Sequence, residues 1–162
     1  VCAGISKANF IVEPANFNCP GQVVIAGSAD AVAQAGEELK TAGAKRVVSL
    51  PVSAPFHCSL MQPAKDAMAE YLNNITINDL NIPIMNNVDA AVEKTGADVK
   101  NALIRQVAGT VKWTQSVENM IAAGVTTFIE VGAGSVLTGL IKKINKTVET
   151  INISTVDDLG KL

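Results

Sequence analysis

The segment Ser49-Leu-Pro-Val-Ser-Ala-Pro-Phe-His-Cys-Ser-Leu-Met-Gln-Pro63 joins two stretches of different periodicity and contains the only histidine of the chain. Residues 46–52 have the β-branched character of a strand, and residues 60–72 repeat apolar side chains at helical spacing. Pro51 and Pro55 fix φ and disfavour helix at the residues before them. We therefore expect a rigid, non-helical loop between a strand and a helix.

The histidine, His57, stands near the end of this expected loop. Ser59 and Gln62 have the spacing of a capping box, so we expect the helix to begin just after the histidine. Connections between the carboxyl end of a strand and the start of a helix are where α/β proteins place catalytic groups. His57 is therefore a candidate catalytic residue. The alternative is a histidine that only caps the helix or packs against it.

The first part of the chain alternates short β-type runs with one helical segment. The expected strands are residues 10–13, 22–26 and 45–52. Residues 14–21 are rich in Asn and Pro and are expected to form a loop between the first two strands. Ser28 can cap the helix, and Gly43 can end it in a left-handed conformation. This order of elements predicts the later part of a small α+β layer.

The second part alternates helices and strands. After residues 60–72, helices are expected to begin at the caps Asp98 and Ser135 and, between them, at Thr114. The expected strands are residues 82–88, 126–131 and 148–153, the first two of them buried. Strands that alternate with helices indicate a parallel sheet, so the expected fold class is α/β.

Composition limits the kind of protein that this chain can be. Of its 162 residues 48% are hydrophobic, which is enough for a core. The net charge of −2 argues against nucleic-acid binding. No apolar run approaches the roughly 20 residues of a membrane helix. Cys2, Cys19 and Cys58 are odd in number and lack metal-type spacing, which fits a reducing cytoplasm and predicts no metal site.

Four motifs, in order along nearly the whole chain, resemble those of the malonyl-CoA:acyl-carrier-protein transacylases. They are Pro14-Ala-Asn-Phe-Asn-Cys-Pro-Gly-Gln-Val-Val-Ile-Ala-Gly27, Ser53-Ala-Pro-Phe-His-Cys-Ser-Leu-Met61, Ala102-Leu-Ile-Arg-Gln106 leading to Val111-Lys-Trp-Thr114, and Ile129-Glu-Val-Gly-Ala-Gly-Ser-Val-Leu-Thr-Gly-Leu140. The nucleophile of that family is a serine in a Gly-His-Ser-x-Gly elbow, and this sequence contains no Gly-x-Ser-x-Gly. Because it also begins at Val1 without methionine, we expect the C-terminal portion of such an enzyme.

The resemblance implies a chain of two parts. Residues 1–52 would form part of a ferredoxin-like α+β small subdomain, and residues 53–162 would form the second half of a hydrolase-like α/β large, catalytic subdomain. The serine, an arginine for the malonyl carboxylate and the oxyanion amides would lie in an upstream N-terminal part of the same enzyme. We therefore expect these 162 residues alone to be inactive.

The resemblance also implies the reaction, which is transfer of malonyl from malonyl-CoA to the phosphopantetheine thiol of acyl carrier protein in fatty-acid biosynthesis. The acyl group would pass through a malonyl-serine ester. His57 would act as general base and then as general acid, because imidazole titrates near neutral pH. The main-chain carbonyl of Gln106 would hold the other ring nitrogen. The two substrates and the upstream part would be the partners, and no cofactor, metal, nucleic acid or membrane is implied.

Substrate contacts follow from the same resemblance. Asn16, Asn18 and Gln22 would line the cleft for the pantetheine arm, although asparagines in a loop can also serve only their own backbone. Phe56 directly precedes His57 and would shape acyl selectivity, since related acyltransferases with an Ala-Phe-His loop accept malonyl. Pro55 interrupts that motif here.

Two other functions stay open. The chain could belong to an α/β serine hydrolase of the patatin or esterase type, or it could be a non-catalytic fragment that keeps the fold. A thiol enzyme built on Cys58 is disfavoured, because adjacent residues rarely form a nucleophile–base pair and there is no second histidine. Residues 132–139 resemble a dinucleotide-binding loop, but Leu137 occupies a position where that fingerprint needs glycine.

Overall fold

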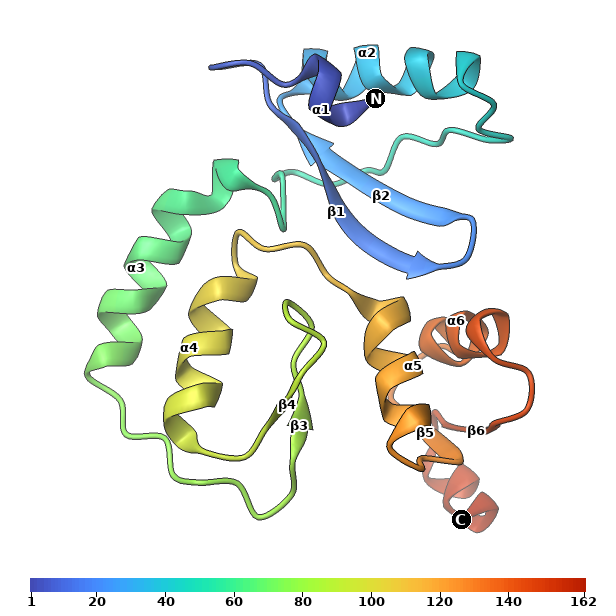
Figure 1. Ribbon diagram of the computed structural model, residues 1–162. Coiled ribbons are helices and arrows are strands. Elements are labelled where there is room, and N and C mark those ends of the chain that lie inside the picture. The colour runs from blue at the N-terminus through green and yellow to red at the C-terminus, as the bar shows by residue number, and fades with distance from the viewer.

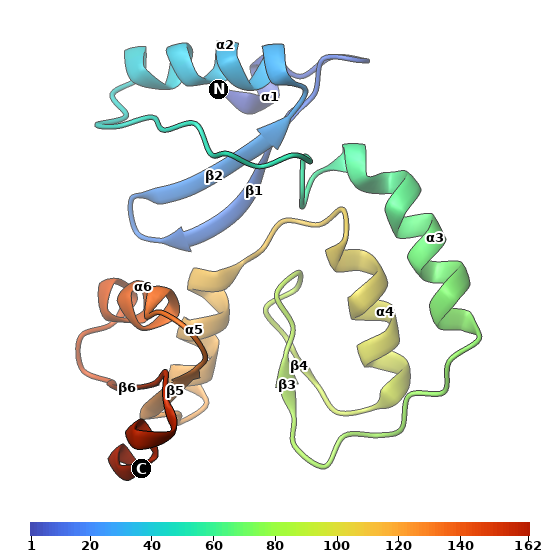
Figure 2. The same ribbon diagram turned by 180° about the vertical axis from the view of Figure 1, so that it is seen from behind.

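Six α-helices and three two-stranded sheets make up the computed structural model, which describes residues 1–162. Figure 1 shows a hairpin of β1 and β2 beside α1 and α2, with two further groups of elements beyond it. One group contains α3, α4, β3 and β4, and the other contains α5, α6, β5, β6 and the C-terminus. Figure 2 shows the same arrangement from behind. The mixed α/β architecture agrees with the predicted class.

The N-terminal unit is a hairpin covered by two helices. Its elements are α1 (Cys2–Ile5), β1 (Val12–Cys19), β2 (Gln22–Gly27) and α2 (Ala29–Thr41). Its core is formed by four fully or nearly buried aliphatic side chains, Ile5, Val12, Ala31 and Ala35. Gly27 is required where β2 ends, because a Cβ there would lie 1.9 Å from Ile11 O. The predicted strand at residues 22–26 and the predicted helix after Ser28 are both present.

Residues 14–21 do not form the predicted loop, because β1 continues to Cys19. Pro14 lies within the strand, where the register with β2 shifts between Pro14 and Asn16 and a missing N–H is tolerated. The other edge of β1 is also bonded. Val111 N–H donates to Ala15 O, and Phe17 N–H donates to Val111 O, each at 2.8 Å. Bonds on both edges explain why an Asn- and Pro-rich segment is extended.

Residues 45–52 form no strand, which corrects the prediction for this segment. The chain is irregular there and makes a local bond from Val52 N–H to Leu50 O at 2.9 Å. The β-branched side chains are exposed instead of buried, Val52 to 61%. A strand requires hydrogen bonds to the backbone of a neighbour, and this local bond is the only backbone hydrogen bond of residues 45–52.

The middle of the chain contains a helical pair and a short hairpin. Its elements are the 3₁₀ turn η1 (Ser59–Met61), α3 (Gln62–Asn73), β3 (Ile84–Met85), β4 (Val92–Glu93) and α4 (Gly96–Gln106). The helix predicted at residues 60–72 is present, but Ser59 forms no capping box with Gln62. Thr95, rather than Asp98, caps α4, since its Oγ1 accepts from Asp98 N–H at 3.1 Å.

The buried strand predicted at residues 82–88 is reduced to two residues. β3 pairs with β4 in an antiparallel hairpin, and Ile82 is 78% exposed. Asn86 explains the early end of the strand. Its side-chain Oδ1 accepts from Asp89 N–H at 2.7 Å, which turns the chain after Met85. Apolar composition alone could not distinguish this short hairpin from a buried central strand.

The C-terminal unit contains α5 (Trp113–Ala122), β5 (Thr127–Val131), α6 (Val136–Ile144), β6 (Glu149–Ile153) and the 3₁₀ segment η2 (Val156–Lys161). β5 and β6 are parallel, from Thr127 opposite Glu149 to Val131 opposite Ile153. The predicted helices and strands are therefore present in this unit. β5 is not buried on both faces as predicted, because Val131 is 78% exposed.

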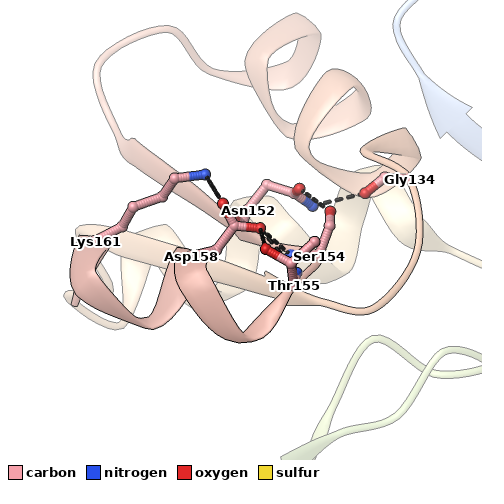
Figure 3. Close-up of polar contacts among 6 residues, drawn as sticks. All are labelled: Gly134, Asn152, Ser154, Thr155, Asp158 and Lys161. Carbon is pink, nitrogen blue, oxygen red and sulfur yellow. Dashed lines mark hydrogen bonds and ion pairs between the residues drawn. The ribbon is translucent and has the colours of Figure 1, made fainter.

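A polar network fastens the end of β6 to the turn before α6. Figure 3 shows that Asn152 Nδ2 donates to Gly134 O at 2.7 Å. In the same network Asp158 accepts from Ser154 N–H at 2.9 Å and from Thr155 N–H at 2.8 Å. The Lys161 ammonium and these backbone donors hold the pKa of Asp158 well below its usual range. The sequence did not predict this network, because Asn152 and Gly134 lie 18 positions apart in different segments.

None of the helices has both the length and the apolar composition that crossing a bilayer requires.

Candidate functional site

His57 has a left-handed backbone with φ of +61°, which is uncommon for a residue with a side chain. Such a conformation costs on the order of 1–3 kcal/mol and is retained where surrounding contacts hold it. The two residues that follow His57 are held by hydrogen bonds. Cys58 Sγ donates to Pro55 O at 3.2 Å, and Ser59 N–H donates to Glu13 Oε2 at 2.7 Å. The histidine loop is therefore fixed in a strained conformation.

The imidazole of His57 faces the carboxyl end of α4. Its Nδ1 lies 2.9 Å from the main-chain oxygen of Gln106, the last residue of that helix. A carbonyl oxygen can only accept a hydrogen bond, so Nδ1 carries the proton. Nε2 is then the ring nitrogen that can accept a proton in the neutral form. The bond to Gln106 persists when the ring is protonated, so the ring keeps its orientation in both states.

Glu13 connects the histidine loop to β1. Its two carboxylate oxygens accept from Ser59 N–H at 2.7 Å and from Ser59 Oγ at 2.9 Å. Sequence analysis missed Glu13, because nothing near residue 13 indicates a partner 46 positions later. The nearest signal was Ser59, whose hydroxyl was expected to cap a helix and instead binds this carboxylate.

Cys58 is a packed thiol. It is 1% exposed, and burial raises the pKa of its thiol. The carboxylate of Glu13 adds to that rise. A thiolate nucleophile needs the opposite environment, exposed and electropositive, so Cys58 has no features of a catalytic cysteine.

The predicted substrate residues do not line either of the two pockets described below. Asn16 and Asn18 are half-buried on β1, and Gln22 is exposed at the start of β2. Phe56 is 51% exposed beside His57. None of these four residues lines the hollow of about 580 Å³ beside the hairpin tip or that of about 310 Å³ beside α4. Gln106 lines the second hollow.

The turn between β5 and α6 is already occupied by a side chain of the protein. The Glu130 carboxylate accepts from Leu137 N–H at 3.0 Å and from Thr138 N–H at 2.8 Å. Hydrogen bonds from Thr138 hold the pKa of Glu130 below its usual range. A phosphate bound at the N-terminus of α6 would need the same amide groups. This geometry agrees with the sequence argument against a dinucleotide loop.

No group of three or more His, Cys, Asp or Glu side chains lies close enough together to hold a metal ion. All three cysteines are free thiols.

Comparison with known proteins places the chain in a family. Residues 7–162 match the model of the acyl transferase domain family. The malonyl CoA-acyl carrier protein transacylase of Escherichia coli (strain K12) is 51% identical over 148 residues, which are 91% of this chain and 47% of that protein. The chain thus spans about half the length of the curated relatives that it matches.

Solved structures give the same result. An acyl carrier protein S-malonyltransferase from Vibrio cholerae superposes with a TM-score of 0.95 at 49% identity, and the match covers 99% of this chain and 52% of that one. A malonyl-transacylase in complex with a type II PKS acyl carrier protein has a TM-score of 0.94 at 42% identity, with the same coverage. The resemblance inferred from the four motifs is thereby confirmed, and the chain belongs to the acyl transferase domain family.

Proposed function

We propose that this chain is the C-terminal portion of a malonyl-CoA:acyl-carrier-protein transacylase and carries its acid–base residue, His57. The observation that carries the proposal is the distance of 2.9 Å between His57 Nδ1 and Gln106 O. In this arrangement a main-chain carbonyl does what a carboxylate does in many serine enzymes, which is to fix the tautomer and direct Nε2 outward. It adds no buried charge.

In the first half-reaction Nε2 removes the proton of a serine hydroxyl as the serine oxygen attacks the thioester carbon of malonyl-CoA. The carbon–sulfur bond then breaks, and Nε2–H protonates the departing thiolate. In the second half-reaction Nε2 removes the proton of the carrier-protein thiol, whose sulfur attacks the carbonyl carbon of the malonyl-serine ester. The ester carbon–oxygen bond then breaks, and Nε2–H returns the proton to the serine oxygen. The serine comes from an upstream part of the enzyme, since the 162 residues contain no Gly-x-Ser-x-Gly.

The remaining residues and boundaries complete the proposal. Asn16, Asn18 and Gln22 contact the pantetheine arm, and Phe56 limits the size of the acyl group. Residues 1–52 belong to the small subdomain and residues 53–162 to the large catalytic one. The half-buried position of both asparagines on β1 supports this role, because neither residue is enclosed in the core. The reaction needs no cofactor or metal, and its place in the cytoplasm stays a prediction.

The test is malonyl transfer by the full-length enzyme with His57→Ala. We expect transfer to fall by about 10²- to 10⁴-fold, the usual contribution of positioned acid–base catalysis. Thermal unfolding should change little, because the side chain is only half-buried in a loop. Mass spectrometry of the wild-type enzyme after mixing with malonyl-CoA should detect a malonyl adduct on a serine.

The same experiment separates the other two functions. Rapid release of free malonate without transfer would indicate a hydrolase, and no reaction at all would indicate a non-catalytic protein. Transfer by His57→Ala within about three-fold of wild type would remove His57 from the catalytic role.

A further inference from the structure

The loop that carries His57 is bonded to β1 through a pair of contacts to one carboxylate. Ser59 N–H lies 2.7 Å from Glu13 Oε2, and Ser59 Oγ lies 2.9 Å from Glu13 Oε1. Hydrogen bonds to an ionised acceptor are stronger than neutral ones, and two of them to one carboxylate fix orientation as well as distance. Ser59 is therefore held in a single position, two residues after the histidine.

The histidine loop needs such a contact, because φ of His57 is +61°. If residue 59 were released, His57 could relax to the negative φ that L residues prefer. That rotation would move the imidazole relative to α4, and the bond of 2.9 Å from Nδ1 to Gln106 O would lengthen or break. The hydrogen bond from Cys58 Sγ to Pro55 O joins two residues of the loop and does not attach the loop to another element.

β1 also bonds to the segment that follows Gln106, the residue whose carbonyl bonds to His57. The two residues after Glu13 bind the segment that follows Gln106. Pro14 O accepts from Thr110 Oγ1, and Ala15 O accepts from Val111 N–H, both at 2.8 Å. Three consecutive residues of β1 therefore bond to the histidine loop and to the segment that follows α4.

We propose that Glu13 is a positioning residue for His57. It acts through Ser59 and maintains the loop conformation in which Nδ1 donates to Gln106. The expected effect on rate rests on the proposed function. The effect on the hydrogen bond itself can be measured without any activity, so the two proposals can fail separately.

The first measurement uses the full-length enzyme labelled with ¹⁵N-histidine. In the wild type, the NMR signal that disappears in His57→Ala belongs to this ring, and its nitrogen shifts should show a proton fixed on Nδ1. In Glu13→Ala we expect these shifts to move toward the mixed tautomers of a solvent-exposed histidine. Ser59→Ala removes only the hydroxyl bond and should produce a smaller change in the same direction. It serves as the second variant if Glu13→Ala does not fold.

The second measurement is steady-state transfer from malonyl-CoA. Glu13→Ala should lower kcat by roughly 10- to 10²-fold with little change in KM, because misplacing a catalytic group weakens the reaction step more than binding. Glu13→Gln should recover most of the rate. Its carbonyl can accept from Ser59 N–H, and its amide can donate to Ser59 Oγ. Glu37→Ala is the matched control, since Glu37 is exposed on α2 and paired with Lys40.

The tautomer of the His57 ring, measured by NMR, decides whether Glu13 is a positioning residue. A changed His57 signal in Glu13→Ala that returns in Glu13→Gln supports the proposal. An unchanged signal overturns it, even if the rate falls. If His57→Ala keeps wild-type transfer, the proposed function fails, while the NMR result still decides whether Glu13 positions the ring.

Discussion

His57 and Phe56 are neighbours with different surroundings and different proposed roles. The ring of His57 is held by Gln106 O, whereas Phe56 is half-exposed. An aromatic side chain that is not part of a core can be replaced without unfolding the protein. Phe56 is therefore suited to a test of selectivity.

We expect Phe56→Ser in the full-length enzyme to shift its preference from malonyl-CoA toward methylmalonyl-CoA. A ring beside the reacting carbon excludes an additional methyl group, an effect of about 1–3 kcal/mol on the ratio of the two kcat/KM values. The measurement is direct competition between the two thioesters. Phe56→Tyr is the control, as it keeps a ring of similar size, and an unchanged ratio in Phe56→Ser would contradict the role in selectivity.

At the scale of single residues, His57 was singled out from the residues themselves, whereas the carbonyl that bonds to its ring was named only through the family resemblance. His57 could be found because it is unique and follows two prolines. Gln106 was named only through the family resemblance, since a main-chain carbonyl leaves no trace in residue type. Glu13 could not be found at all, because its partner Ser59 is distant in sequence and was assigned to a cap.

Among the helices and strands, prediction succeeded where local pattern determines structure. The helix at residues 114–123 and the strand at residues 126–131 are present within a residue or so as α5 and β5. Prediction failed where a strand depends on a distant neighbour. Residues 45–52 have strand composition without a strand, and residues 14–21 have loop composition but form most of β1 beside Val111.

The C-terminal unit should lose stability in acid. The pKa of Asp158 and of Glu130 lies below the usual range in the folded protein. Each carboxylate therefore stabilises the fold fully above its unfolded pKa of about 4, and this contribution is lost as pH falls from there toward the folded pKa. After correction for the intrinsic pH dependence of amide exchange, the protection of α6, β6 and η2 should fall more than that of α2 as the pH is lowered below about 4.

Asp158→Asn tests whether the Asp158 carboxylate causes this loss of stability in acid. The variant should show the weakened protection of η2 already at neutral pH and a smaller further change in acid. The amide oxygen of Asn can accept from Ser154 and Thr155 but lacks the negative charge that strengthens these bonds, and it has no group that titrates in acid. Asp157→Asn is the matched control on the adjacent residue, which makes none of these hydrogen bonds. Equal behaviour of the two variants would refute the role given to Asp158.

The molecule as a whole exposes large aliphatic side chains on several of its elements. Val48, Leu50 and Val52 lie outside any sheet, and Ile129 and Val131 are exposed on β5. β5 and β6 form a parallel sheet of only two strands, although parallel sheets are normally covered on both faces. Apolar surface and unpaired edges of this kind favour association.

Residues 1–162 expressed alone are therefore expected to associate or aggregate, and to retain no label from labelled malonyl-CoA. Size-exclusion chromatography with light scattering measures the first outcome, and mass spectrometry measures the second. Co-expression with the upstream half of a full-length relative is the control that should restore a defined species. A well-folded monomer that carries label on a serine such as Ser53 or Ser135 would show that the nucleophile was misjudged.

The shared attachment to β1 also has a consequence for the order of folding. The bond between His57 and Gln106 closes a loop of 49 residues, and the contacts of β1 with Ser59 and Thr110 span 46 and 96 residues. Contacts between distant parts of the chain form slowly, because the entropy of loop closure is lost before the contact is gained. We expect the β1–β2 hairpin and α2 to fold early, and the proton-transfer geometry to be among the last features to form. A newly made chain would then have its histidine long before it has a catalytic base.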